Sequence, residues 1–309
     1  MSESDFNLKN TTVTIVGLGL MGGSLGLALK ENNVCHKVVG LVRRPEAATQ
    51  ALELNIVDEA TLNLAAALGQ ADIVVFSTPI RTVIRHLGEY AAFFKPGAII
   101  TDMGSTKQEI TLAMDALPAG LQPVGSHPMC GKETAGMAAA EASLYYDAPW
   151  VITPLERTDP AANQAIEDMA KAIGAKPLSL DAGRHDKLVA TISHLPFTMA
   201  TSLVLAAQTI AADDPAVWDV AATGFKDTSR VAASDTTMWL DILLTNRPAM
   251  QQLIGLARQQ LDNFATALAA GDEEALRAMM EIAADQRRKM YRSTNEVIED
   301  GHENVKRKT

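Results

Sequence analysis

A glycine-rich turn near the N-terminus constrains the fold of this chain most strongly. The apolar run Val13–Val16 leads directly into Gly17-Leu18-Gly19-Leu20-Met21-Gly22, and a helix-favouring segment follows. A strand, a GxGxxG turn and a helix in this order are typical of a dinucleotide-binding unit. Gly17 permits the tight turn, Gly19 lets the backbone approach a pyrophosphate, and Gly22 allows close packing of helix on strand. We therefore assign Gly17, Gly19, Leu20, Met21 and Gly22 to cofactor binding.

The first half of the chain alternates short β-branched runs with helix-favouring stretches. The expected strands are Val13–Val16, Lys37–Val42, Ile73–Ser77, Ala98–Thr101, Gln122–Val124, Trp150–Thr153 and Pro177–Leu180. The expected helices are Gly23–Glu31, Glu46–Leu54, Arg81–Phe94, Lys107–Leu117 and Pro160–Ile173. Strands that alternate with helices predict an α/β fold of the Rossmann type, with a doubly wound, mostly parallel sheet covered on both faces.

The strand signal ends near residue 181. Three long stretches rich in Ala, Leu, Met and Gln follow, at Asp186–Ala211, Arg247–Ala270 and Glu273–Val297. The pattern predicts a dinucleotide-binding domain over residues 11–181 and an all-helical substrate and dimerisation domain over residues 182–309. The apolar surface of these helices needs a partner face, so we expect a homodimer.

Composition excludes several functional classes. The net charge of -10 argues against a nucleic-acid surface. Cys35 and Cys130 stand far apart in the sequence, which argues against a disulfide framework or a structural zinc site. The polar N-terminus is unlike a signal peptide. We therefore expect a cytoplasmic protein without a metal. The window Leu188–Ala207 is long enough to span a bilayer, but it contains His194, Pro196 and several hydroxyl residues. It predicts a buried helix or subunit interface rather than a membrane span.

The end of the second expected strand bears on the choice of cofactor. NAD enzymes place an acidic residue there to bind the adenosine ribose. Here Val42 is followed by Arg43 and Arg44, with no acid before Glu46. Guanidinium groups pair well with a 2′-phosphate, so we expect NADP more than NAD, and the alternative is that both arginines are solvated turn residues. Further cofactor contacts are expected at Val42 and, after the third expected strand, at Thr78 and Pro79.

Two histidines and one arginine are candidates for chemistry. His127 follows an apolar strand, where loops form the ligand crevice, and could accept a hydroxyl proton as hydride leaves the same carbon; a structural role is as compatible. His194 follows His185 by nine residues, which puts the two on opposite sides of an ideal helix and argues against a metal pair. A lone helical histidine such as His194 is more often a core residue. Arg230 suits a carboxylate, or a salt bridge with Asp227 or Asp235.

Taken together, the motifs resemble those of the prephenate and arogenate dehydrogenase family of tyrosine biosynthesis. The resemblance covers about residues 12 to 290 and includes Met238-Trp239 with Asp241 and Asn246. The other matching stretches are Val16–Ser24, Thr101-Asp102-Met103-Gly104-Ser105-Thr106-Lys107, Gly125-Ser126-His127-Pro128-Met129, Ile192-Ser193-His194-Leu195-Pro196 and Gly224-Phe225-Lys226-Asp227-Thr228-Ser229-Arg230. The resemblance implies oxidative decarboxylation of a cyclohexadienol, with hydride transfer to NAD(P)+ and formation of 4-hydroxyphenylpyruvate or tyrosine.

The resemblance also implies roles for single residues. His127 would accept the hydroxyl proton, and Ser105 would orient His127. His194 would contact the substrate, and Arg230 would bind a substrate carboxylate. Lys132 and Glu133 would lie near the substrate, but Lys132 stands where relatives often have Thr or Pro. The choice between prephenate and arogenate therefore stays open.

Regulation and two rival functions complete the expectations. The chain ends too early for an appended regulatory domain, so any inhibition by tyrosine is expected at the active site. One rival is a β-hydroxyacid-type dehydrogenase with a helical lysine, for which Lys187 is the nearest candidate. The other is a nonenzymatic NADP-binding sensor.

Overall fold

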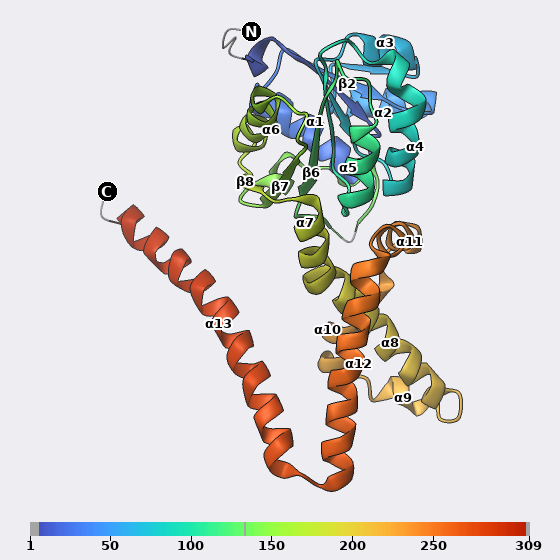
Figure 1. Cartoon of the computed structure of the whole chain (residues 1–309), viewed down its shortest axis with the longest axis vertical. Helices are drawn as coiled ribbons and strands as arrows, with labels where there is room; N and C mark the ends of the chain where they lie inside the picture. The colour runs from blue at the N-terminus through green and yellow to red at the C-terminus, as the bar shows by residue number, and fades with distance from the viewer. Residues whose placement is uncertain (1–5, 133, 307–309) are drawn as a thin grey trace. The chain divides into compact units, whose positions relative to one another are not determined.

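The computed structural model describes residues 6–132 and 134–306, and its core is an eight-stranded sheet (Figure 1). The strand order is β3-β2-β1-β4-β5-β6-β7-β8; β7 runs antiparallel to β6, and all other neighbours are parallel. The strands are β1 Thr12–Val16, β2 Lys37–Leu41, β3 Glu59–Thr61, β4 Ile73–Phe76, β5 Ile99–Asp102, β6 Gln122–Pro128, β7 Pro149–Pro154 and β8 Lys176–Ser179. The predicted mostly parallel sheet is confirmed. The pattern missed β3, because three residues at a sheet edge carry too little periodicity.

Helices cover both faces of the sheet, as expected for a doubly wound fold. One buried cluster joins α1, α2 and α6 to the sheet, and Leu25 and Ile166 lie in it. The other joins α3, α4 and α5 to the opposite face, through residues such as Leu68, Val83 and Ile110. These helices are α1 Leu20–Glu31, α2 Pro45–Glu53, α3 Leu64–Gly69, α4 Ile80–Tyr90, α5 Gln108–Asp115 and α6 Pro160–Ala172.

The strand order reverses between β1 and β4, which places a crevice at the carboxyl ends of these two strands. The Gly17 amide donates to Leu41 O at 3.1 Å, and the Ser77 amide donates to Val16 O at 2.9 Å. The ends of β1, β2 and β4 therefore meet at this point. The glycine turn lies where a doubly wound fold binds its ligand.

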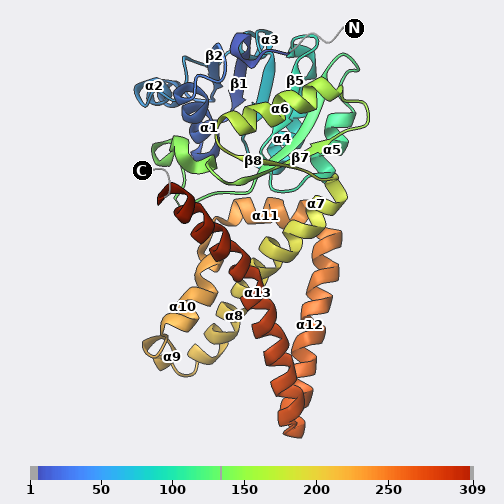
Figure 2. The ribbon, with the colours of Figure 1, turned by 90° about the vertical axis from the view of Figure 1, so that its left-hand side faces the viewer.

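Among the described residues, only helices follow β8. They are α7 Ala182–Val189, the π-helical turn η5 Ala190–His194, α8 Leu195–Ala211, α9 Ala216–Asp219, α10 Thr223–Ser229, the 3-10 turn η6 Arg230–Ala233, α11 Thr236–Thr245, α12 Arg247–Ala270 and α13 Glu273–Lys306. The chain forms two compact units, one reaching to Met250 and one starting at Gln251. Helices α7 to α11 thus belong to the same unit as the sheet, and α11 packs against α4 (Figure 2).

The most apolar helical stretch is less buried within the chain than expected. Residues 182–211 are long and apolar enough to cross a membrane, and 22% of the most apolar window is buried. Ile192, Leu205 and Ile210 are exposed. The predicted helix is therefore mostly not buried within the single chain, and its burial at a subunit interface stays a prediction, because composition measures apolar surface but does not identify what covers it.

Candidate active site

The three glycines of the turn lack a Cβ for different structural reasons. Gly17 has a φ of +95°, and an added Cβ would lie 2.7 Å from Thr78 Cγ2. A Cβ on Gly22 would lie 2.1 Å from Gly17 O, so this position must stay bare for α1 to pack. A Cβ on Gly19 would meet nothing within 4 Å. Packing within the chain therefore requires Gly17 and Gly22, whereas the open space at Gly19 fits the approach of a dinucleotide pyrophosphate to the start of α1.

The neighbouring residues also fit such a group. Thr78 Oγ1 is buried beside Gly17 without a hydrogen-bond partner in the described part of the chain. An unpaired buried hydroxyl is costly, so a ligand atom there would satisfy it. Pro79 is exposed and precedes α4, and Leu20 opens α1. Met21 is tied into the fold, since its carbonyl accepts the Tyr145 hydroxyl at 2.5 Å.

The residues after β2 divide into one that is buried and two that are exposed. Val42 is 8% exposed and its side chain packs in the core cluster of α1. Arg43 and Arg44 are exposed, and neither forms an ion pair with another described residue. Both guanidinium groups are thus available to an anion.

His127 lies near the carboxyl end of β6 and stays partly exposed. Its Nδ1 is 2.9 Å from His185 Nε2, and His185 Nδ1 is 2.8 Å from Asp186 Oδ1. His185 and Asp186 come from α7 and are fully buried. Burial, followed by the nearby His185, Lys107 and His194, holds the pKa of His127 well below its ordinary value of 6.5. A neutral imidazole with Nδ1 already engaged therefore stands at the crevice.

The structure pairs His127 with a residue other than the expected Ser105. Among the described residues, no hydrogen bond joins Ser105 to His127, and His185 occupies the Nδ1 side instead. His185 lies 58 residues further along the chain than His127. Sequence spacing cannot reveal a contact of that separation, so the role of His185 becomes visible only in the folded chain.

The structure also corrects the helical phase of His185 and His194. The expectation of opposite helix sides assumed an uninterrupted α-helix, but the five-residue π-turn Ala190–His194 lies between α7 and α8. A π-turn changes the angular step per residue and shifts every side chain that follows. Both histidines are buried and interact electrostatically: burial lowers the pKa of His194 to about 4, with Asp186 opposing and His185 adding to the shift.

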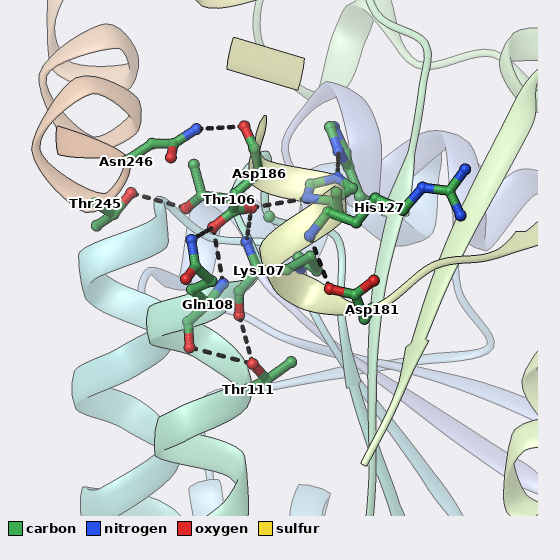
Figure 3. Close-up of polar contacts among 12 residues, drawn as sticks. Thr106, Lys107, Gln108, Thr111, His127, Asp181, Asp186, Thr245 and Asn246 are labelled. Carbon is green, nitrogen blue, oxygen red and sulfur yellow. Dashed lines mark hydrogen bonds and ion pairs between the residues drawn. The ribbon is translucent and has the colours of Figure 1, made fainter. Parts of the chain in front are cut away.

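Asn246 fixes the state of His194. The Asn246 Nδ2 group donates to Asp186 O at 2.8 Å, which identifies this atom as the amide nitrogen (Figure 3). The same Nδ2 lies 3.3 Å from His194 Nδ1, so Nδ1 is the acceptor of this contact. Neutral His194 therefore carries its hydrogen on Nε2 and can act as a donor. The His194 ring also packs edge-on against Trp239, with 5.9 Å between the ring centroids.

A buried ion pair supports the strand that carries His127. Lys107 and Asp102 contact each other and are fully buried. Lys107 Nζ also donates to Ser126 O at 2.7 Å, and Asp102 accepts from the Ser126 amide at 3.0 Å. Both residues lie in a motif that was used for the resemblance, but neither was assigned a role. An aspartate that ends an apolar strand is the signal that could have found them.

The remaining expected substrate residues are placed as follows. Lys132 pairs with Glu141 at the surface. Glu133 lies outside the described residues. Arg230 is exposed at the first residue of η6, which packs against α8. No group of three or more His, Cys, Asp or Glu side chains in the described chain is arranged to hold a metal ion.

Comparisons with known proteins identify the family of this chain. The family model of the prephenate dehydrogenase nucleotide-binding domain matches residues 25–178, and that of the prephenate dehydrogenase dimerization domain matches residues 181–282. The prephenate dehydrogenase of Bacillus subtilis is 33% identical over 91% of this chain and 76% of its own length.

Two solved structures are similar over nearly their whole length. Synechocystis arogenate dehydrogenase has a TM-score of 0.79 at 30% identity, covering 90% of this chain and 99% of its own. The second structure is prephenate dehydrogenase from A. aeolicus in complex with hydroxyphenyl propionate and NAD+. It has a TM-score of 0.85 at 27% identity, and the match covers 91% of this chain and 98% of its own. This chain is therefore a nicotinamide-dependent dehydrogenase and belongs to the prephenate dehydrogenase family.

Proposed function

We propose that this enzyme oxidatively decarboxylates prephenate, arogenate or both, giving 4-hydroxyphenylpyruvate or tyrosine. The observation that carries the proposal is the state of His127: its Nδ1 faces His185, so Nε2 is left for a substrate hydroxyl. The names of its relatives, prephenate dehydrogenase and arogenate dehydrogenase, support the same substrate class.

The reaction needs one group that accepts a hydride and another that accepts a proton. A nicotinamide cofactor held at the glycine turn would supply the hydride acceptor. His127 Nε2 takes the proton of the hydroxyl on the same carbon, and carbon dioxide leaves as the ring becomes aromatic. A histidine kept neutral by burial is ready to accept that proton.

Several residues are assigned to contacts with the substrate. His194 would donate from Nε2 to a substrate oxygen, and Arg230 would pair with a carboxylate. Lys132 and Glu133 would face the substrate side chain, and Ser105 would lie beside His127 as a further polar contact. These five residue assignments rest on family resemblance, and that of His194 rests also on its donor state.

The test is an assay with each of the two substrates and each of the two cofactors, following the absorbance of reduced nicotinamide. Turnover in at least one of the four combinations is expected. No turnover in any of them would defeat the proposed function and would favour the nonenzymatic sensor. Turnover of a β-hydroxyacid instead would favour the rival dehydrogenase, although its candidate Lys187 is exposed.

NADP is proposed as the preferred cofactor, because Arg43 and Arg44 are exposed after β2. Arg43→Ala and Arg44→Ala are each expected to raise KM for NADP by roughly 10-fold, since a hydrogen bond to a charged group is worth about 1.5–3 kcal/mol. KM for NAD should change little. These variants are better probes than Val42→Asp, which would put a charge into the core. Equal changes with both cofactors would contradict the NADP assignment.

The pH dependence of kcat/KM follows from the state of His127. Protonation removes the Nε2 lone pair, so activity should be lost as pH falls through the pKa of His127. That pKa is lowered below 6.5 by burial and by His185 on α7, Lys107 before α5 and His194 on η5. We expect kcat/KM to stay level from about pH 8 to 6.5 and to fall only at lower pH. A midpoint of the acid limb at or above 6.5 would contradict this assignment.

We further propose a cytoplasmic homodimer, with a domain boundary near residue 181. The match to a dimerization domain and the exposed apolar residues of α8 support self-association. For the homodimer we expect a dimeric mass in solution, and a monomeric mass would contradict it.

Tyrosine is proposed to inhibit by occupying the active site. We expect tyrosine to inhibit competitively against the substrate, and noncompetitive inhibition would contradict this proposal.

A further inference from the structure

The two buried α7 residues beside the active site have no role in the reaction as described above. His185 has both ring nitrogens engaged, one by His127 and one by Asp186. Asp186 is itself anchored, because its carboxylate accepts the Lys107 amide at 2.6 Å and the Gln108 amide at 2.9 Å. These amides belong to the N-terminus of α5, where a negative charge is stabilised (Figure 3).

The hydrogen bonds determine where each hydrogen lies. Burial raises the pKa of Asp186, but hydrogen bonds from His185, Gln108 and Lys107 outweigh burial and hold it below its ordinary value. The ionised carboxylate can only accept, so His185 Nδ1 must carry a hydrogen. One hydrogen lies between His127 Nδ1 and His185 Nε2, and when His185 accepts it on Nε2, His127 Nδ1 is the donor. His127 Nε2 is then the unprotonated nitrogen.

We propose that His185, held by Asp186, is a positioning residue that fixes His127 as the Nδ1–H tautomer and takes over its positive charge during the reaction. This inference rests on the proposed function. The substrate O–H bond breaks and an N–H bond forms at His127 Nε2. The Nδ1–H bond of His127 then breaks, and an N–H bond forms at His185 Nε2. No electrons are gained or lost by the two rings, and the proton returns along the same route after product release.

Burial and neighbouring charges disfavour a positive charge that stays on His127. Lys107, before α5, and His194, on η5, both disfavour a cation on the His127 ring. His185 instead contacts the anionic Asp186 at 2.8 Å. Asp102, at the end of β5, is already paired with Lys107, and among the described residues no ion pair joins it to either histidine. Moving the charge by one ring therefore places it beside its only direct carboxylate partner among the described residues.

The first experiment measures the tautomer without relying on turnover. The ring-nitrogen resonances of 15N-histidine-labelled enzyme are recorded with NADP or NAD bound and substrate absent. We expect His127 to show a protonated Nδ1 and an unprotonated Nε2, and His185 to show the same pattern. A His127 ring protonated on Nε2 would overturn the proposal.

The second experiment separates positioning from packing. His185→Phe keeps a planar ring but removes the acceptor, whereas His185→Gln offers an amide oxygen that can still accept from His127 Nδ1. We expect kcat to fall roughly 10- to 100-fold in His185→Phe with little change in KM, because part of the 10²- to 10⁴-fold gain of acid–base catalysis depends on the tautomer. His185→Gln should recover the Nδ1–H tautomer and part of kcat. Arg184→Gln, at an exposed position on the same helix, is the matched control and should resemble wild type.

The outcomes distinguish this inference from the proposed function. Wild-type kcat and an unchanged tautomer in His185→Phe would overturn the positioning role. If His185→Phe fails to fold, the wild-type spectrum and His185→Gln decide the question by themselves. Absence of turnover in wild-type enzyme with every substrate would defeat the proposed function, yet leave the tautomer measurement intact.

Discussion

His127→Asn is expected to lower kcat by about 10²- to 10⁴-fold, the usual contribution of a positioned proton acceptor. Asparagine keeps a polar group on β6 but cannot take up a proton. His127 is the partly exposed member of the histidine pair, and its Nε2 is the nitrogen not engaged by His185. Steady-state kinetics with the preferred substrate and cofactor measures the loss.

Two comparisons make this prediction specific. Lys187→Ala, which removes the lysine of the rival mechanism, should retain wild-type kcat because Lys187 is exposed on α7. Cofactor binding by His127→Asn, followed by fluorescence titration, should be close to that of wild type because the glycine turn is unchanged. A larger loss of kcat in Lys187→Ala than in His127→Asn would reverse the assignment.

Lys107→Met is expected to reduce the free energy of unfolding by about 3–5 kcal/mol, because it leaves a buried charge on Asp102 without its partner. The variant also loses the hydrogen bond to Ser126 O, which links the N-cap of α5 to the strand of His127. The three tryptophans, Trp150, Trp218 and Trp239, all precede residue 251. Their fluorescence in urea therefore follows the unit that contains this ion pair.

Lys95→Met is the matched control for this measurement. Lys95 also pairs with an aspartate, Asp72, but its side chain is 45% exposed. Pairs of this kind contribute at most about 1 kcal/mol, so the transition midpoint should move little. Equal destabilisation by the two variants would show that burial does not set the strength of the Lys107–Asp102 pair.

Local signals predicted most of the fold. The strand before Gly17 and the helix after it follow from hydrophobic periodicity and from the absence of a Cβ at three positions. Two strands at the far end of the sheet were also predicted from short apolar runs, although the antiparallel direction of β7 was not. β3 was missed because the Glu59–Thr61 segment has no apolar pattern.

The candidate site was only partly predictable. His127 could be placed at the crevice because it follows an apolar strand, and Arg43 and Arg44 could be placed after β2. The pairing of His127 with His185 could not be found in this way, and family resemblance had suggested Ser105 as the partner. The π-turn before Pro196 also has no signal in residue spacing, and it invalidated the phase argument for His194.

The sequence by itself determined the doubly wound sheet, the cofactor turn and the class of chemistry. The first two depend on neighbouring residues, whose periodicity and steric limits act along the chain, whereas the class of chemistry was implied by the resemblance of several spaced motifs to a known family. Tertiary structure decided which groups surround His127, where Asp186 anchors its charge and which nitrogen is left to accept a proton. Those features depend on the docking of α7 against α5 and β6, and contacts between distant segments are set by packing rather than by local sequence.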